Sequence, residues 1–192
     1  MSGSPALHRV GIFGGSFDPP HVGHVLAVHA ALMTGEVDEC VVVPCFRHAF
    51  DKSLQPFDDR MAMCRIAFEH LNRTSISEVE RILGHESFTV RTLQYLQGQN
   101  PSWAMRLIVG TDVVADIRRW LEPETVMRLA PLIVVGRQGY DAHQDHSEGP
   151  RLLPEISSTQ IRGLLNASDL AGARGLVPTG VLAYIESKAL YR

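Results

Sequence analysis

The stretch that most constrains this chain is a short apolar run that breaks at two glycines and leads into a run of helix formers. The apolar run covers residues 10–13, the break is Gly14-Gly15, and the helix formers cover residues 25–33. We expect a buried strand, a turn in which glycine permits positive φ and close approach to another molecule, and a buried helix. This arrangement aims backbone N–H groups at an anion, so it predicts a phosphate-binding loop.

Two histidines stand where this helix should begin. His21 and His24 are three residues apart and therefore lie near one another on one face. The stretch has neither the lysine of a Walker loop nor the spacing of the dinucleotide fingerprint. Phosphate would thus be met by backbone N–H groups and imidazole. The structural alternative is a tight turn followed by two surface histidines.

Strand-like and helix-like runs alternate along the chain. We expect strands at residues 9–13, 40–44, 74–79, 105–110 and 132–136, with helices from about residue 24, at 58–70 and at 89–97. Alternation of this kind with nearly continuous apolar strands predicts an α/β fold: a single Rossmann-like, doubly wound parallel sheet with helices on both faces. Ligands bind such sheets beyond the carboxyl ends of the strands, near the point where the strand order reverses.

Composition narrows the function classes. The chain has 192 residues, 45% of them hydrophobic, and a net charge of −3, which predicts one domain (1–192) and neither disorder nor a nucleic-acid surface. No apolar run approaches the ~20 residues of a membrane helix, and no signal peptide is recognised, so we expect no membrane partner. Cys40, Cys45 and Cys64 form no Cys-x-x-Cys pattern and fit buried, reduced thiols in the cytoplasm. Whether the chain forms a homo-oligomer stays open.

The residues that follow each strand are the candidates for a site. Arg47, His48 and Lys52 follow the second strand and either meet phosphate or are solvated. Thr89 or Ser87 stands at a helix start after the third strand, as an N-cap or a ligand contact. Asp112 follows the fourth strand, where a carboxylate can accept from ribose hydroxyls. Arg137 follows the fifth, where it could reach a polyphosphate.

A second candidate anion site lies near residue 157. Ser157 or Ser158 can cap a helix there, and Arg162, one turn in, projects back toward the helix start. The alternative is a capped helix with a surface arginine.

The polar segment 138–150 contains His143 and His146, with Asp141 and Asp145 nearby. It fits a surface loop better than a metal site, because nothing there fixes three or four ligands. The pair His21 and His24 also lacks a third ligand at a recognisable spacing, so no protein-held metal is expected.

The motifs resemble a known family. The chain reads Gly14-Gly15-Ser16-Phe17-Asp18-Pro19-Pro20-His21-Val22-Gly23-His24, which resembles the signature of the nucleotidyltransferase superfamily with a His-x-Gly-His motif. Its Gly-Gly-(Ser/Thr)-Phe-Asp-Pro-x-His form is similar to that of bacterial nicotinate-nucleotide adenylyltransferases. A second stretch, Ser157-Ser158-Thr159-Gln160-Ile161-Arg162, resembles the family's ATP-holding Ser-x-Thr-x-Ile-Arg signature. Gly110-Thr111-Asp112, Trp120 and the segment 181–192 also match in order, so the resemblance covers almost the whole chain.

The resemblance implies transfer of AMP from ATP to nicotinate mononucleotide, giving deamido-NAD and pyrophosphate in NAD biosynthesis, with Mg²⁺ bound with ATP. His21, His24 and Arg162 are the implied catalytic donors. The core would cover about residues 8–136, and the second ATP motif with the C-terminal helices residues 151–192. The expected ATP contacts are Gly14, Gly15, Ser16, Phe17, His24, Gly110, Asp112, Arg137, Ser157, Ser158, Thr159 and Arg162. The expected mononucleotide contacts are Ser16, His48, Lys52, Thr89, Asp112 and Trp120. Phe17 and Trp120 could stack on rings or belong to the core.

One departure from the family falls on the acceptor side. The family usually has Pro-Pro-His-Lys after the second strand, where this chain has Phe46-Arg47-His48-Ala49-Phe50-Asp51-Lys52. This leaves nicotinamide mononucleotide, alone or beside nicotinate mononucleotide, as the alternative acceptor. Phosphopantetheine enzymes are shorter, and cytidylyltransferases usually carry Arg-Thr-x-Gly-Ile-Ser as their second signature. A non-catalytic nucleotide sensor is disfavoured because His21, His24 and Arg162 are all present.

Overall fold

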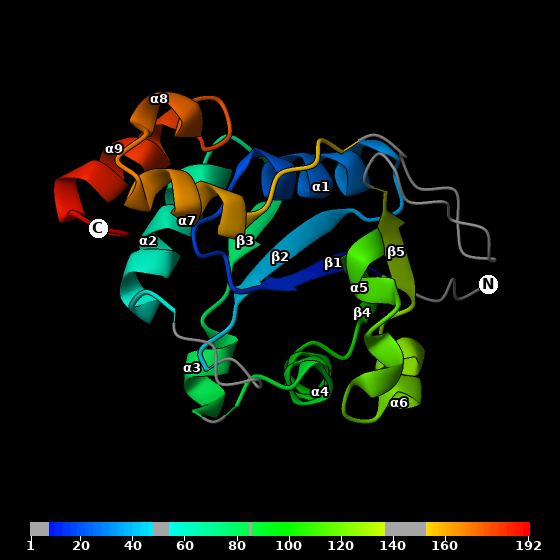
Figure 1. Cartoon of the computed structure of the whole chain (residues 1–192). Coiled ribbons are helices and arrows are strands. Elements are labelled where there is room, and N and C mark those ends of the chain that lie inside the picture. The colour runs from blue at the N-terminus through cyan, green and yellow to red at the C-terminus, as the bar shows by residue number, and fades with distance from the viewer. Residues whose placement is uncertain (1–7, 48–53, 85, 137–152) are drawn as a thin grey trace, which may run out of the picture.

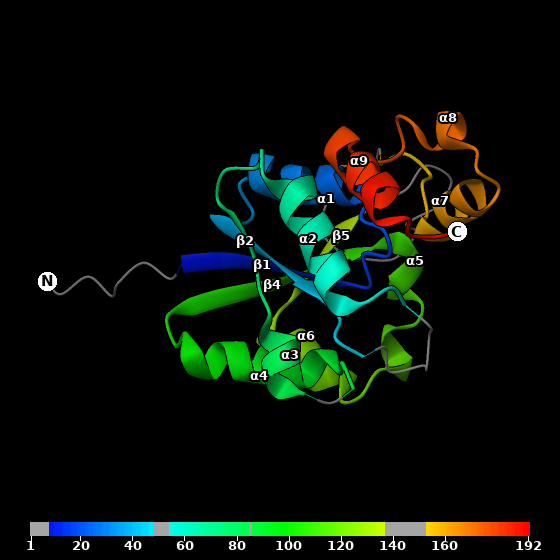
Figure 2. The same ribbon diagram turned by 90° about the vertical axis from the view of Figure 1, so that its left-hand side faces the viewer.

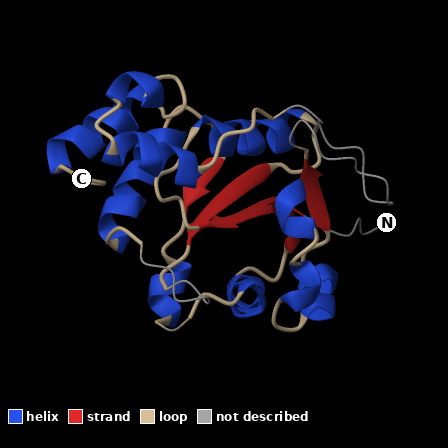
Figure 3. Cartoon of the chain, viewed as in Figure 1, coloured by secondary structure: helices blue, strands red, loops and turns tan. Residues whose placement is uncertain are grey.

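The computed structural model describes residues 8–47, 54–84, 86–136 and 153–192. Within them, five parallel strands form one sheet in the order β3-β2-β1-β4-β5 (Figure 3). The strands are β1 (His8–Gly15), β2 (Glu39–Pro44), β3 (Thr74–Ile76), β4 (Trp103–Gly110) and β5 (Leu132–Val135). The predicted doubly wound α/β fold is confirmed.

Helices cover both faces of this sheet (Figures 1 and 2). One side carries α1 (Val22–Met33), α2 (Phe57–Phe68), α7 (Ser158–Asn166), α8 (Leu170–Ala173) and α9 (Thr179–Lys188). The other side carries α3 (Val79–Leu83), α4 (Thr89–Gln99) and α6 (Pro123–Leu129). A short helix α5 (Thr111–Val114) and the 3-10 turn η1 (Ile117–Arg119) follow β4 directly.

The side chains of the strands alternate between two cores, one on each face. In β2, Cys40 and Val42 pack with the core that includes α1, α2 and α9, while Val41 and Val43 pack with α4 and α6. Successive strand residues point to opposite faces, and both faces are covered, so every position of β2 from residue 40 on can be apolar. This explains the unbroken Cys-Val-Val-Val run.

The observed elements differ from the predicted ones in places. The third strand was expected to run to residue 79, but it ends at Ile76, and Val79 instead begins α3. The hydroxyl of Ser77 accepts a hydrogen bond from the Val79 N–H at 3.2 Å, which turns the chain away from the sheet. The short helices α3, α5, α6 and α8 were not predicted, because 4 to 7 residues show little periodicity.

The strand order reverses between β1 and β4. From β1 the chain proceeds through β2 to β3 at one edge, and it returns beside β1 as β4 before adding β5 at the other edge. A crevice is expected beyond the carboxyl ends of these two central strands. In the part of the chain that the structure describes, no helix is long and apolar enough to cross a membrane.

A matched pair of isoleucine substitutions tests the core. Ile133 in β5 is fully buried, whereas Ile82 in α3 is 66% exposed. We expect Ile133→Ala to lower the free energy of unfolding by about 2–5 kcal/mol through lost burial and a cavity. Ile82→Ala should change it by less than about 0.5 kcal/mol. Urea unfolding followed by circular dichroism measures both, and equal losses would contradict the assignment of Ile133 to the core.

Candidate active site

A cavity of about 1080 Å³ opens at the carboxyl ends of the strands, where the strand order reverses. Strands β1, β2, β4 and β5 all contribute lining residues, together with the first turns of α1, α4 and α5. The cavity brings together nine residues that the sequence nominated: Gly14, Gly15, Ser16, His21, His24, Thr89, Gly110, Asp112 and Trp120. A concave site of this size at this position is the default place for a ligand.

The glycines of the loop serve close approach and not positive φ. The positive φ lies at Phe17 (47°), whereas Gly14 and Gly15 are the last residues of β1 and do not use the positive φ that glycine permits. A Cβ on Gly14 would meet no atom within 4 Å, which means that this position presents bare backbone to the cavity. A Cβ on Gly15 would lie 3.2 Å from the ring of Phe17.

Side chains from distant helices hold the carbonyl groups of this loop. The carbonyl of Ser16 accepts from Arg60 Nη1 at 2.8 Å, and that of Asp18 accepts from Arg162 Nη1 at 2.7 Å. The Pro19 carbonyl accepts from the hydroxyl of Ser158 at 3.0 Å.

None of these three donors is among the described residues that line the cavity. The carbonyl oxygens are therefore engaged away from the cavity, which leaves the loop able to present N–H groups to an anion.

The two histidines close the first turn of α1. His21 is the N-cap residue and His24 is the third helical residue; the His24 side chain accepts from the backbone N–H of His21, and the His24 N–H donates to the His21 backbone carbonyl at 2.9 Å. The rings stack with centroids 3.6 Å apart at an interplanar angle of 24°. A Cβ on Gly23 would lie 3.1 Å from the His21 ring, so glycine between the histidines leaves room for this stack.

The cap also fixes the tautomer of His24. Its Nδ1 accepts from the backbone N–H of His21 at 3.1 Å, so Nδ1 carries no proton and the neutral ring carries its proton on Nε2. The ring of Phe17 meets His24 edge-on, with centroids 4.9 Å apart. Phe17 is itself fully buried, so its ring belongs to the core and does not stack on a ligand.

The second signature starts α7 and contacts the loop. Ser157 is the N-cap residue, and its hydroxyl accepts from the Gln160 N–H at 3.1 Å. Of the two serines considered as caps, Ser158 instead binds the loop through Pro19. Arg162 projects back toward the helix start, as predicted, and its Nη2 donates to Thr159 Oγ1 at 3.1 Å.

The opposite wall of the cavity carries Thr89, Asp112 and Trp120. A Cβ on Gly110 would collide with Asp112 Oδ1, so glycine at the end of β4 permits the observed position of the carboxylate. Thr89 begins α4, but the N-cap residue is Phe88 and no side chain caps the helix, so the predicted capping role of Thr89 is wrong.

A polar network that contributes Glu80 and Thr92 to the lining of the cavity was not predicted. Glu80 accepts from the Phe46 N–H at 3.0 Å and from Thr92 Oγ1 at 3.1 Å, which ties the segment after β2 to α4. Burial raises the pKa of Glu80. Arg60, 1% exposed, lies near enough to lower that pKa in part. No sequence pattern marks either residue, because each stands among other charged residues of its helix, most of them exposed.

Some nominated residues lie outside the described part of the chain. They are His48, Lys52 and Arg137, together with the polar segment 138–150. Among the described residues, no group of three or more His, Cys, Asp or Glu side chains could hold a metal ion. The three cysteines are buried free thiols, as predicted.

Comparisons with known proteins agree on one family. The model of the family described as cytidylyltransferase-like matches residues 12–164. The chain is 41% identical over 195 residues to a protein of Anaeromyxobacter dehalogenans named "Probable nicotinate-nucleotide adenylyltransferase", with both chains covered completely. It is 36% identical to the Myxococcus xanthus protein of the same name, over 97% of this chain and 96% of that one.

A solved structure shares the fold. The nicotinic acid mononucleotide adenylyltransferase of Plasmodium falciparum complexed with NaAD superposes with a TM-score of 0.79 at 22% identity, covering 96% of this chain and 97% of that chain.

The buried carboxylate of Glu80 predicts a pH dependence of stability. The unfolded chain releases the Glu80 proton near the ordinary pKa of 4.5, whereas the folded chain keeps it to higher pH. Raising the pH through this window therefore lowers the free energy of unfolding. Glutamine has no such proton, so the stability of Glu80→Gln relative to the unaltered chain should grow as the pH rises from 4.5. Urea unfolding at several pH values measures this difference, and a difference that stays constant or shrinks would contradict it.

Proposed function

The chain belongs to the cytidylyltransferase-like family, and we infer that it is a nicotinate-nucleotide adenylyltransferase, which transfers AMP from ATP to nicotinate mononucleotide. The products are deamido-NAD and pyrophosphate. The observation that carries this inference is the stacked pair His21 and His24 at the start of α1, beside a loop whose carbonyls are turned away from the cavity. Full-length identity of 41% to a relative of that name supports the choice of substrates.

The chemistry needs positioning and charge stabilisation more than proton transfer. The phosphate of the mononucleotide is already an anion, so no general base is required to activate it. One of its oxygens bonds to the α-phosphorus of ATP, while the bond from that phosphorus to the oxygen bridging the α and β positions breaks. Pyrophosphate leaves on the opposite side. Mg²⁺ enters as part of the MgATP substrate.

The loop and the histidines meet the negative charge that develops. The N–H groups of the loop and the dipole of α1, equivalent to about half a positive charge at the helix start, favour the phosphates there. His24 donates from Nε2 to the α- and β-phosphate oxygens, because its Nδ1 is occupied by the cap. His21 lines the same cavity and stands beside it.

Arg162 serves both the loop and the phosphates. A guanidinium has five N–H donors, and Arg162 directs donors to the Asp18 carbonyl and to Thr159. Arg162 does not line the cavity, so its remaining donors would meet the β- and γ-phosphates where ATP extends past the lining residues toward α7. On the opposite wall, Trp120 and Thr89 face the nicotinate ring, and Asp112 accepts from ribose hydroxyls. A reducing, cytoplasmic compartment fits the three free thiols.

Two substitutions of His24 separate its role in capping α1 from its role as a hydrogen-bond donor to the phosphates. His24→Ala removes both, whereas the amide oxygen of His24→Asn can still accept from the His21 N–H. Both should lower kcat at least about a hundredfold, because a donor to the developing charge is worth on the order of 3 kcal/mol. Only His24→Ala should lose stability, by about 1 kcal/mol.

The matched control is His29→Ala, on the exposed side of the same helix. Pyrophosphate release and thermal unfolding are measured for all three variants. If His24→Asn keeps near-normal turnover, the Nε2 donor plays no part in the reaction.

Substrate choice is tested by pyrophosphate release with MgATP and either nicotinate or nicotinamide mononucleotide over a concentration series. We expect kcat/KM to favour nicotinate by more than about a hundredfold, or ~2.7 kcal/mol. Comparable rates, or a preference for nicotinamide, would overturn the acceptor and keep adenylyl transfer. Binding of ATP without pyrophosphate release would identify a sensor instead.

A further inference from the structure

The segment that follows α9 returns to the phosphate-binding loop between β1 and α1. The hydroxyl of Tyr191 donates to Asp18 Oδ1 at 2.6 Å, across 173 positions of sequence. Both partners are buried, Tyr191 at 6% exposure and Asp18 at 2%. Asp18 belongs to the loop between β1 and α1, yet neither residue is among the described residues that line the cavity. The contact therefore acts on the loop from behind.

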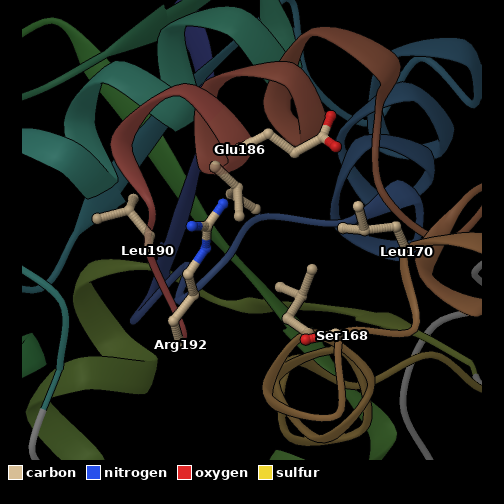
Figure 4. Close-up of a pocket in the computed structure, with 7 residues that line it drawn as sticks. Ser168, Leu170, Glu186, Leu190 and Arg192 are labelled. Atoms are coloured by element: carbon tan, nitrogen blue, oxygen red, sulfur yellow. The ribbon is translucent and has the colours of Figure 1, made fainter.

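The backbone after α9 is shaped to make this contact. Ala189 (φ 54°) and Tyr191 (φ 62°) both adopt the left-handed conformation, which residues other than glycine rarely take. Leu190 and Arg192, the neighbours of Tyr191, line a cavity of about 200 Å³ between α7, α8 and α9 (Figure 4). Because Leu190 and Arg192 on either side of Tyr191 face this cavity, Tyr191 itself points away from it and into the core.

A buried carboxylate needs hydrogen-bond donors, and among the described residues Tyr191 and Gln55 supply them to Asp18. Besides Tyr191, the backbone N–H of Gln55 reaches Asp18 Oδ2, at the longer distance of 3.4 Å. Burial, the hydrogen bond and the charge of Asp18 together raise the pKa of Tyr191. The hydroxyl therefore stays protonated, and able to donate, throughout the neutral range.

Asp18 also connects to Arg162. Its side-chain carboxylate accepts from the Tyr191 hydroxyl, and its backbone carbonyl accepts from Arg162 Nη1 at 2.7 Å. Rotation of Asp18 would move this peptide and with it the guanidinium. It would also move the adjoining N–H groups of the loop.

We propose that Tyr191 is a positioning residue for adenylyl transfer: its hydroxyl fixes Asp18, and through Asp18 the loop N–H groups and Arg162, in the orientation that stabilises the transition state. The effect expected on kcat rests on the proposed function, whereas the effect expected on the order of the loop does not. Tyr191 is placed to touch the loop and not the substrates.

The chain offers a matched control. Tyr184 in α9 makes the same kind of bond, donating to Asp59 Oδ1 in α2 at 2.8 Å, away from the loop. We compare Tyr191→Phe, Tyr184→Phe and a chain with 4-aminophenylalanine at position 191, which restores a donor. Pyrophosphate release is expressed per folded molecule. Hydrogen exchange of the peptide spanning residues 14–20 is measured without substrates.

Tyr191→Phe should lower kcat about tenfold or more, with KM for the mononucleotide unchanged within about twofold, and should speed exchange in residues 14–20. Tyr184→Phe should change neither, and 4-aminophenylalanine should restore most of the kcat. The exchange readout is independent of turnover, so an inactive unaltered chain would defeat the proposed function and leave this comparison intact.

Three results would overturn the proposal. One is unchanged exchange together with kcat within about twofold of the unaltered chain. Another is an equal effect of Tyr184→Phe. The third is a Tyr191→Phe chain that does not fold, because the hydroxyl would then serve the fold as a whole.

Discussion

A loop that binds phosphate must turn its N–H groups toward the anion and its carbonyl oxygens away from it, because a carbonyl facing a triphosphate would repel it. Here the carbonyls of Ser16, Asp18 and Pro19 are held from outside the cavity by Arg60, Arg162 and Ser158. These donors come from α2 and α7, which lie on one side of the sheet. The loop can therefore take its binding geometry only when both helices are in place, and the packing of this helical layer defines the site.

The histidine pair combines a structural and a chemical task. The imidazoles complete the first turn of α1, where serine and glutamate commonly do so, and they line the cavity as well. A stacking distance of 3.6 Å disfavours positive charge on both rings at once. A neutral ring with its proton on Nε2 donates a hydrogen bond without that repulsion. The cap therefore fixes the proton of His24 on Nε2 before a substrate binds.

Local signals predicted much of this molecule. The apolar runs located all five strands, since strands buried on both faces carry unbroken apolar sequence, and the spacing of His21 and His24 anticipated their proximity. What the sequence did not reveal depends on contacts across long separations. Arg60 reaches Ser16 across 44 positions and Tyr191 reaches Asp18 across 173, and neither pair leaves a periodic trace. The sequence allowed two uses for Gly14 and Gly15, positive φ and close approach, and did not tell which of them the loop requires.

The contact between Tyr191 and Asp18 has a consequence for the order of events during synthesis. The loop is translated early, but one of its fixing groups lies 173 residues later. At about 5–20 residues per second, a ribosome needs roughly 9–35 s to cover that distance. The emerging chain must leave the exit tunnel as far as residue 191 before the contact can form. A nascent chain can thus build most of its sheet while its nucleotide site is still incomplete, because the Tyr191 contact forms only after residue 191 has emerged.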